Sequence, residues 1–218
     1  MIITKTFDSR EAWLKGRENF IGGSDASCIM GENPWKSNVD LYLEKTGQKE
    51  PADLSNNELV NYGAAAEQYH RELFKLDYPE YSVKYAENNM WLNSDYPWAH
   101  ASLDGWLYDD NGDLGIFECK TATLSNAAQR RKWEGANMPN YYYWQVIHYM
   151  LVTDAKFAIL RAQLKTNRAG EEVGGYFKHY RITRAEAETN MYRLMIAEKE
   201  FYEHIKRKEC PAKILPLL

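Results

Sequence analysis

Residues 98–120 read WAHASLDGWLYDDNGDLGIFECK, and this stretch predicts two paired strands with a tight turn between them. Trp98–Tyr108 is rich in aromatic residues, as is typical of a strand, and Leu114–Lys120 predicts the strand that returns. Residues 109–112 (DDNG) predict the turn, because Asn-Gly between two apolar runs is a strong hairpin signal. We therefore expect an antiparallel hairpin over this stretch.

Three charged residues fall on the two strands of the expected hairpin, namely Asp104, Glu118 and Lys120. Side chains alternate along a strand, so Glu118 and Lys120 share one face and Cys119 takes the other. The hairpin can bring Asp104 opposite them. By itself this pattern is more often an Asp-Gly turn followed by a solvated strand face. However, the preceding residues 116–117 are apolar, and burying unpaired charges in such a strand would be costly unless a cation were bound.

Two carboxylates and an ammonium group suit the hydrolysis of a phosphodiester bond. Asp104 and Glu118 supply the hard oxygen ligands that Mg²⁺ prefers, and the backbone carbonyl of Cys119 can add another. The ion would polarise the phosphate and lower the pKa of an attacking water. Lys120 can orient that water, help to deprotonate it, or stabilise charge on the phosphate. The residues thus predict a Mg²⁺-dependent nuclease, in which Mn²⁺ can substitute.

The rest of the chain predicts an alternation of helices and strands. Helical periodicity and capping residues predict helices over 9–17, 24–30, 56–76, 125–133, 140–153 and 183–207, and another that begins at Asn38. Ser24 is the expected N-cap of the second helix. Further strands are predicted over 81–85, 89–93, 157–164 and 175–180, with a turn at 166–170. This order predicts an α/β (α+β) fold with a central mixed β-sheet flanked by helices, in a single domain over 1–218.

Composition restricts the class of protein without identifying a partner. The chain has 218 residues, of which 44% are hydrophobic, and a formal net charge of −4. That charge does not indicate nucleic acid, but carboxylates gathered around a metal are compatible with a local basic channel. Three cysteines without CxxC spacing make a disulfide framework or a structural zinc site unexpected. We find no membrane-spanning run and no signal peptide, and so expect a cytoplasmic protein without membrane contact.

Asp104 with residues 118–120 (ECK) resembles the PD-(D/E)xK nuclease motif, with Leu103 where the motif name has proline. Four separated blocks are similar to the lambda-exonuclease group, the YqaJ-type viral recombinase family. In the family's order they are Arg17 with 21–26 (IGGSDA), Tyr62-Gly63 with Ala66-Glu67, 101–105 (ASLDG) with 117–120 (FECK), and 143–150 (YWQVIHYM). Each block is weakly specific alone and together they are fairly specific.

The resemblance implies a PD-(D/E)xK restriction-endonuclease-like core and roles for further residues. Glu67 would reach the metal site, where a third carboxylate helps to hold a second Mg²⁺ ion or a water bound to the first. Gln145 would lie near the metal-bound water or the phosphate. Arg17 and Ser24 would bind a 5′-phosphate, with Ser102 contributing, since Arg offers a fork and a helix N-terminus attracts anions.

The same residues also allow plainer interpretations. Glu67 fits an exposed helical glutamate beside His70 or Arg71, and Gln145 fits a polar interruption in an aromatic core helix. Arg17 and Ser24 fit a surface arginine and an ordinary N-cap. Without the resemblance, the plainer interpretation of Arg17 and Ser24 would be preferred.

The resemblance implies a 5′→3′ exonuclease that degrades one strand of linear double-stranded DNA and leaves 3′ single-stranded tails for annealing recombination. It also implies a homotrimeric ring around DNA ends, a single-strand annealing protein as partner, and a phage or prophage origin in a bacterial host. Two alternatives stay open: a structure-specific endonuclease of the same superfamily, and an inactive DNA-binding protein on a nuclease fold.

Two segments are candidates for further DNA contacts. Arg130, Arg131 and Lys132, followed by Trp133, form the best local basic and aromatic cluster and could contact the DNA backbone. Such a run is equally typical of a solvated helix end. The loop that carries Trp35 and Lys36 is expected to lie near the DNA close to the active site.

Overall fold

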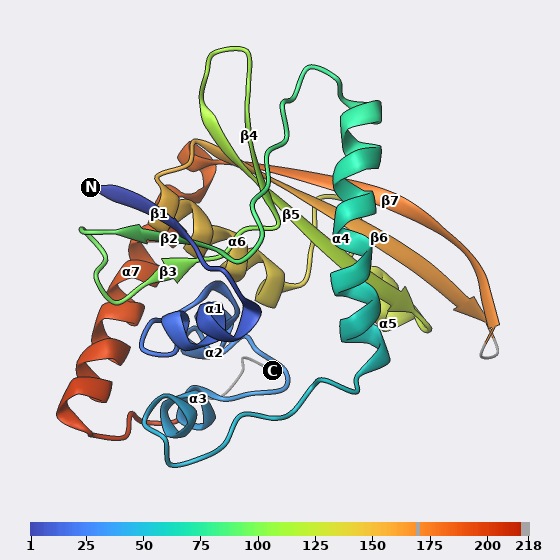
Figure 1. The fold of residues 1–218 in the computed structure, drawn as a ribbon. Coiled ribbons are helices and arrows are strands. Elements are labelled where there is room, and N and C mark those ends of the chain that lie inside the picture. Colours follow the sequence, from blue (N-terminus) through green and yellow to red (C-terminus); the bar gives the residue numbers. More distant parts are fainter. Residues whose placement is uncertain (169–170, 215–218) are drawn as a thin grey trace.

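The structure is a computed structural model that describes residues 1–168 and 171–214. Figure 1 shows a twisted β-sheet with helices on both of its faces. The helices are α1 (Arg10–Arg17), α2 (Gly23–Ile29), α3 (Asn38–Lys45), α4 (Glu58–Asp77), α5 (Ala127–Arg131), α6 (Asn140–Thr153) and α7 (Arg184–Arg207). The strands are β1 (Ile2–Thr6), β2 (Asn89–Asn93), β3 (His100–Ala101), β4 (Gly105–Tyr108), β5 (Leu114–Leu124), β6 (Phe157–Arg168) and β7 (Glu171–Thr183).

The larger sheet has the strand order β4-β5-β6-β7 and is mixed, as the sequence predicts. Strand β5 pairs antiparallel with β4 and parallel with β6, while β6 pairs antiparallel with β7. The parallel step requires a crossover, and α6 supplies it. A second sheet has the order β1-β2-β3. The predicted α/β (α+β) class with a central mixed sheet is confirmed.

Two apolar clusters lie on opposite faces of the larger sheet. On one face, Ile116 of β5 belongs to the main core, which includes the buried residues of α2, α6 and α7. On the other face, Phe117 packs with Phe74 of α4, their ring centroids 4.7 Å apart. Alternation along β5 therefore directs even-numbered side chains toward α6 and odd-numbered ones toward α4.

The expected single strand over 98–108 is wrong, because the chain bends between β3 and β4 and enters two different sheets. Asn89 explains the bend. Its side-chain amide donates to the carbonyl of Leu103 at 2.9 Å and accepts from the N–H of Leu103 at 2.9 Å. The Asn89 amide thus satisfies the N–H and the C=O of Leu103, which lies between β3 and β4 and has no strand partner for these groups.

Other boundaries differ from the prediction for local reasons. The segment 81–85 is not a strand, since only Lys84 pairs, in an isolated bridge with Trp106. The helix expected over 125–133 is confined to α5, which Asn126 caps through the N–H of Gln129. Strand β1 was not expected. All five of its residues are exposed, so the sequence lacks the alternation of apolar and polar residues that marks a half-buried strand. The predicted turn at 166–170 lies partly outside the described residues.

No helix among residues 1–168 and 171–214 has both the length and the apolar character needed to cross a membrane.

Candidate active site

The candidate site lies where β5 extends beyond β4. Strand β4 pairs with β5 only from Leu114 to Phe117, whereas β6 pairs with β5 as far as Leu124. Cys119 therefore faces an open edge of the sheet. Its N–H donates a hydrogen bond of 2.9 Å to Oδ2 of Asp104, which directly precedes β4. Because the N–H and C=O of one strand residue point to the same neighbour, the Cys119 carbonyl faces this edge too.

Glu118, the next residue back along β5, points to the α6 side and is 1% exposed. Its Oε1 lies 2.7 Å from Nζ of Lys120 and accepts a hydrogen bond of 2.9 Å from Nε2 of Gln145 on α6. Gln145 also donates to the hydroxyl of Tyr149, one helical turn later, at 2.9 Å. The structure thus brings together the predicted residues Asp104, Glu118, Lys120 and Gln145.

The electrostatics of the site are those of crowded carboxylates. Burial, followed by the charge of Asp104, raises the pKa of Glu118 to about 8. Burial also raises the pKa of Asp104, although Lys120 and the hydrogen bond from Cys119 oppose it. Burial alone would lower the pKa of Lys120, but the charges of Glu118 and Asp104 outweigh it and raise that pKa. The ammonium group therefore stays protonated at neutral pH.

Glu67 projects from α4 toward the same centre. Burial and then the charge of Asp104 raise the pKa of Glu67 to about 7, so the two carboxylates interact electrostatically. Arg71, one turn further along α4, is buried and donates through Nη1 to the backbone carbonyl of Asp104 at 2.9 Å. The sequence did not single out Arg71, although its spacing from Glu67 places both on one helix face.

The donor set fits a divalent cation. Oε2 of Glu118 is buried and has no hydrogen-bond partner in the described residues. An unpaired buried carboxylate oxygen is costly, and a cation would remove that cost. No three His, Cys, Asp or Glu side chains in the described ranges form a metal-binding group by themselves. The fitting set is therefore Asp104, Glu118 and the Cys119 carbonyl, with Glu67 nearby.

Arg17 and Ser102, two of the expected phosphate ligands, both contact Trp13. The guanidinium of Arg17 lies over the ring of Trp13, 4.2 Å from its centroid. Nε1 of Trp13 donates to Oγ of Ser102 at 3.2 Å. Ser102 lies two residues before Asp104 in the chain. This arrangement connects Arg17 with the segment that leads into the candidate site.

Ser24 is not the N-cap of α2, contrary to the prediction. The N-cap is Gly22, whose N–H donates to the carboxylate of Asp25 at 3.0 Å. Ser24 lies in the first turn and is exposed. A glycine is required at 23, because a Cβ there would be 2.4 Å from the ring of Tyr149 and 3.0 Å from Cγ of Gln145. The start of α2 therefore lies beside Gln145, and the Asp25 carboxylate already takes the helix N-terminus.

The basic run Arg130, Arg131 and Lys132 is exposed at the end of α5. Trp133, by contrast, is buried in the main core and packs against Tyr142 and Tyr180. The expected basic and aromatic surface cluster therefore lacks its tryptophan. Lys36 is paired with Glu44 at 2.5 Å, which neutralises the charge expected to face DNA.

Solved structures show the class of fold to which this site belongs. The chain is similar to an alkaline exonuclease from Laribacter hongkongensis, with a TM-score of 0.59 and 16% identity, over 91% of this chain and 97% of that one. A phage-related exonuclease from Haemophilus somnus has a TM-score of 0.56 and 13% identity, over 87% of this chain and 96% of that one. The fold is that of the alkaline exonucleases.

The chain belongs to the family of the YqaJ-like viral recombinase domain, which it matches over residues 12–156. It is 33% identical over 150 residues to the uncharacterized protein YqaJ of Bacillus subtilis (strain 168). The match covers 68% of this chain and 44% of that protein, so this chain spans less than half the length of the relative. The resemblance inferred from the sequence blocks is confirmed.

Proposed function

We propose that this protein is a Mg²⁺-dependent deoxyribonuclease, for which Mn²⁺ can substitute as the ion. The observation that carries the proposal is Glu118, a buried carboxylate with one oxygen held by Lys120 and Gln145 and the other without a partner. A purely structural ion pair would satisfy both oxygens. Membership of a viral recombinase family and the exonuclease fold are consistent with this chemistry.

Each residue has a distinct task in the proposed reaction. Asp104, Glu118 and the Cys119 carbonyl would hold the ion, and Glu67 would support a second one. The bound metal would polarise the phosphate and lower the pKa of a water. Lys120 is held by Glu118 in a position to orient that water or to stabilise charge on the phosphate. Gln145 fixes Glu118, and Arg71 fixes the backbone at Asp104.

The finer proposal is a 5′→3′ exonuclease acting on ends of linear double-stranded DNA. Arg17, together with Ser102 and Ser24, would bind the 5′-phosphate. In support of this, Trp13 connects Arg17 to Ser102, and the first turn of α2 adjoins Gln145. An arginine fork gives phosphate oxygens two parallel hydrogen bonds. A fixed distance between such a pocket and the metal would make cleavage begin at an end.

Further parts of the proposal rest on the family alone. We propose a homotrimeric ring around DNA, a single-strand annealing protein as partner, a phage or prophage origin, and action in the cytoplasm of the bacterial host. Arg130, Arg131 and Lys132 would contact the DNA backbone, where exposed cations lower the free energy of binding.

The test uses linear duplexes labelled at each end, with and without 5′-phosphates, and a covalently closed circle. We expect Mg²⁺-dependent release of nucleotides from 5′ ends, faster with a phosphate, and an intact circle. Cleavage of the circle would instead indicate an endonuclease. Undiminished turnover in excess EDTA would contradict the metal mechanism.

A further inference from the structure

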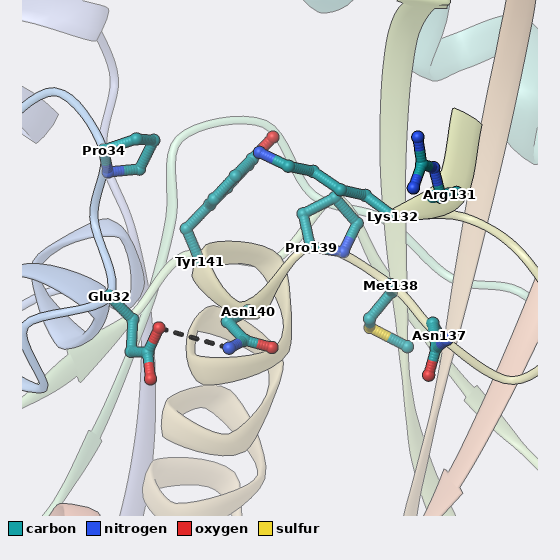
Figure 2. Close-up of a pocket in the computed structure, with 9 residues that line it drawn as sticks. All are labelled: Glu32, Pro34, Arg131, Lys132, Asn137, Met138, Pro139, Asn140 and Tyr141. Carbon is teal, nitrogen blue, oxygen red and sulfur yellow. Dashed lines mark hydrogen bonds between the residues drawn. The ribbon is translucent and has the colours of Figure 1, made fainter. Parts of the chain in front are cut away.

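A surface pocket of about 420 Å³ lies between the loop after α2, the segment after α5 and the start of α6 (Figure 2). The lining residues that matter here are Glu32, Pro34, Arg131, Lys132, Asn140 and Tyr141. Sites for small ligands commonly have volumes of roughly 300–1,000 Å³. This pocket is therefore large enough for one nucleotide and too small for a folded partner.

A row of aromatic rings connects the pocket to the candidate active site. Nζ of Lys120 lies 5.1 Å from the ring centroid of Tyr142. The rings of Tyr142 and Tyr141 are 4.4 Å apart, and those of Tyr141 and Trp35 are 4.8 Å apart. Trp35 ends the row and is 75% exposed. An exposed tryptophan fixed against another ring offers a face on which a base can stack.

Two cations, Arg131 and Lys132, also line the pocket, and the side chain of Lys132 extends toward the Tyr141 hydroxyl (Figure 2). Arg131 and Lys132 are exposed, and within residues 1–168 and 171–214 neither makes a side-chain hydrogen bond or ion pair. The segment that follows them is anchored to β7: Lys178 donates to the carbonyls of Trp133 and Gly135. The two cations therefore stand on an anchored segment with their charges available to an anion.

Glu32, the acidic residue of the pocket, determines how a nucleotide would be oriented in it. Figure 2 shows Glu32 and Arg131 on opposite sides. Oε2 of Glu32 accepts from Nδ2 of Asn140 at 3.1 Å, which leaves the Asn140 carbonyl oxygen as an acceptor. A phosphate is thus repelled from the Glu32 side and attracted to the basic side, while an amide oxygen is available to a base amino group.

We propose that this pocket, together with Trp35, which adjoins it through the ring of Tyr141, binds an unpaired nucleotide of single-stranded DNA. The base would stack on Trp35 and the phosphate would contact Arg131 and Lys132. The inference rests on the proposed nuclease function and deepens it, because it gives a strand separated from the duplex a path away from Lys120. Stacking on a ring does not depend on base identity, so binding is expected to tolerate any sequence.

The test measures binding of a fluorescent oligothymidylate by anisotropy in EDTA, where no hydrolysis occurs. We compare the wild type with Trp35→Ala, Lys132→Ala and the double variant. Tyr192→Ala and Lys199→Ala are matched controls, since both residues are exposed on α7. Trp35 and Lys132 are also exposed, so these substitutions should leave folding intact, which circular dichroism checks.

We expect each pocket variant to bind the oligonucleotide roughly tenfold more weakly, the order of effect of losing one stacked base or one charged contact. The controls should bind as the wild type does. Wild-type affinity in both pocket variants would overturn the inference, as would a wild type that does not bind the oligonucleotide. Hydrolysis of duplex DNA with Mg²⁺ is measured separately. A failure of the proposed nuclease function can therefore be distinguished from a failure of the proposed nucleotide pocket. An occupant of another kind, such as an acidic peptide, would leave DNA binding by the variants unchanged.

Discussion

Nε2 of Gln145 donates to the same oxygen of Glu118 that the ammonium group of Lys120 contacts, at 2.9 Å and 2.7 Å respectively. Both partners of Glu118 thus converge on Oε1, and Oε2 is left without a partner in the described residues. Helix α6 and strand β5 are joined at this carboxylate. The side chain of Gln145 is therefore a positioning group, because it fixes the orientation of a ligand.

Gln145→Ala should lower the turnover of DNA by about 10–100-fold, the usual cost of losing a group that orients a metal ligand. The apparent affinity for Mg²⁺ should fall as well. Steady-state rates at several Mg²⁺ concentrations measure both effects. Gln68→Ala, an exposed glutamine on α4, is the matched control and should change neither. An unchanged turnover rate in the Gln145 variant would contradict the positioning role of Gln145.

Lys120→Ala should reduce hydrolysis by about 10²–10⁴-fold, the range typical of a lost proton-transfer or charge-stabilising group. Binding of duplex DNA in EDTA should persist, because Lys120 lies within the site and exposed cations supply most of the binding free energy. Lys199→Ala provides the comparison for a lysine remote from the site. If Lys120→Ala lost DNA binding and activity in equal proportion, the residue would be a DNA contact instead.

Glu118→Gln should abolish stabilisation by the metal. At an Mg²⁺ concentration about 100-fold above Kd, a site gains about 2.7 kcal/mol, which for a chain of this size raises Tm by about 5–10 °C. We expect that rise in the wild type and its absence in Glu118→Gln. The Tm is measured by thermal unfolding in Mg²⁺ and in EDTA, which does not require turnover of DNA. Glu200→Gln, on the exposed face of α7, is the control. A wild-type Tm that changes with neither Mg²⁺ nor Mn²⁺ would contradict the metal site.

The hairpin and its charges could be predicted from the sequence because local patterns determine them. The turn over residues 109–113, in which Gly112 has a positive φ, sets the register in which Gly105 pairs with Phe117, and Asp104 directly precedes Gly105. Glu118 and Lys120 then share a face through alternation alone. Regular alternation and helical periodicity also predicted most of the helices and the strands β2, β6 and β7.

The remainder depends on contacts between distant parts of the chain. Nothing near residues 98–108 in the sequence indicates that Asn89 bonds to Leu103 and separates β3 from β4. The N-cap of α2 was misassigned because a serine is usually a better cap than a glycine. Here Tyr149 and Gln145 crowd the backbone at Gly23, and Asp25 supplies the capping oxygen. Arg71 was missed because its partner is a backbone carbonyl on another element.

Arg17→Ala should remove the preference for 5′-phosphorylated ends. A hydrogen bond to a charged group contributes about 1.5–3 kcal/mol, so the ratio of rates on phosphate and hydroxyl ends should fall by roughly 10–100-fold. Competing hydrolysis of the two substrates measures the ratio directly. Lys15→Ala, an exposed cation on the same helix, should preserve it. An equal loss of hydrolysis rate on phosphorylated and hydroxyl ends would show that Arg17 is a general DNA contact and would contradict the proposed phosphate pocket.

A buried ion pair behind the site should make stability depend on pH. His148 of α6 and Glu198 of α7 are both fully buried, with Nδ1 2.6 Å from Oε1. Nε2 of His148 faces the carbonyl of His100 at 2.8 Å. Both ring nitrogens thus face acceptors, which requires a doubly protonated ring. Burial alone would lower the pKa of His148, but the charge and hydrogen bond of Glu198 raise it.

A raised folded pKa stabilises the protein fully below the unfolded value of about 6.5, and this contribution is lost as pH rises through the folded value. Glu198→Gln should therefore cost about 3–5 kcal/mol of unfolding free energy at pH 6, the usual effect of breaking a buried pair. The difference from the wild type should narrow as pH rises above about 6.5, because the histidine of the unfolded chain then loses its proton while His148 of the folded wild type keeps it. Urea denaturation at pH 6, 7, 8 and 9 measures it, with Glu200→Gln as the control on the same helix. A difference that stays constant across this range would mean that His148 is neutral throughout, and that α6 is held by a neutral hydrogen bond instead of an ion pair.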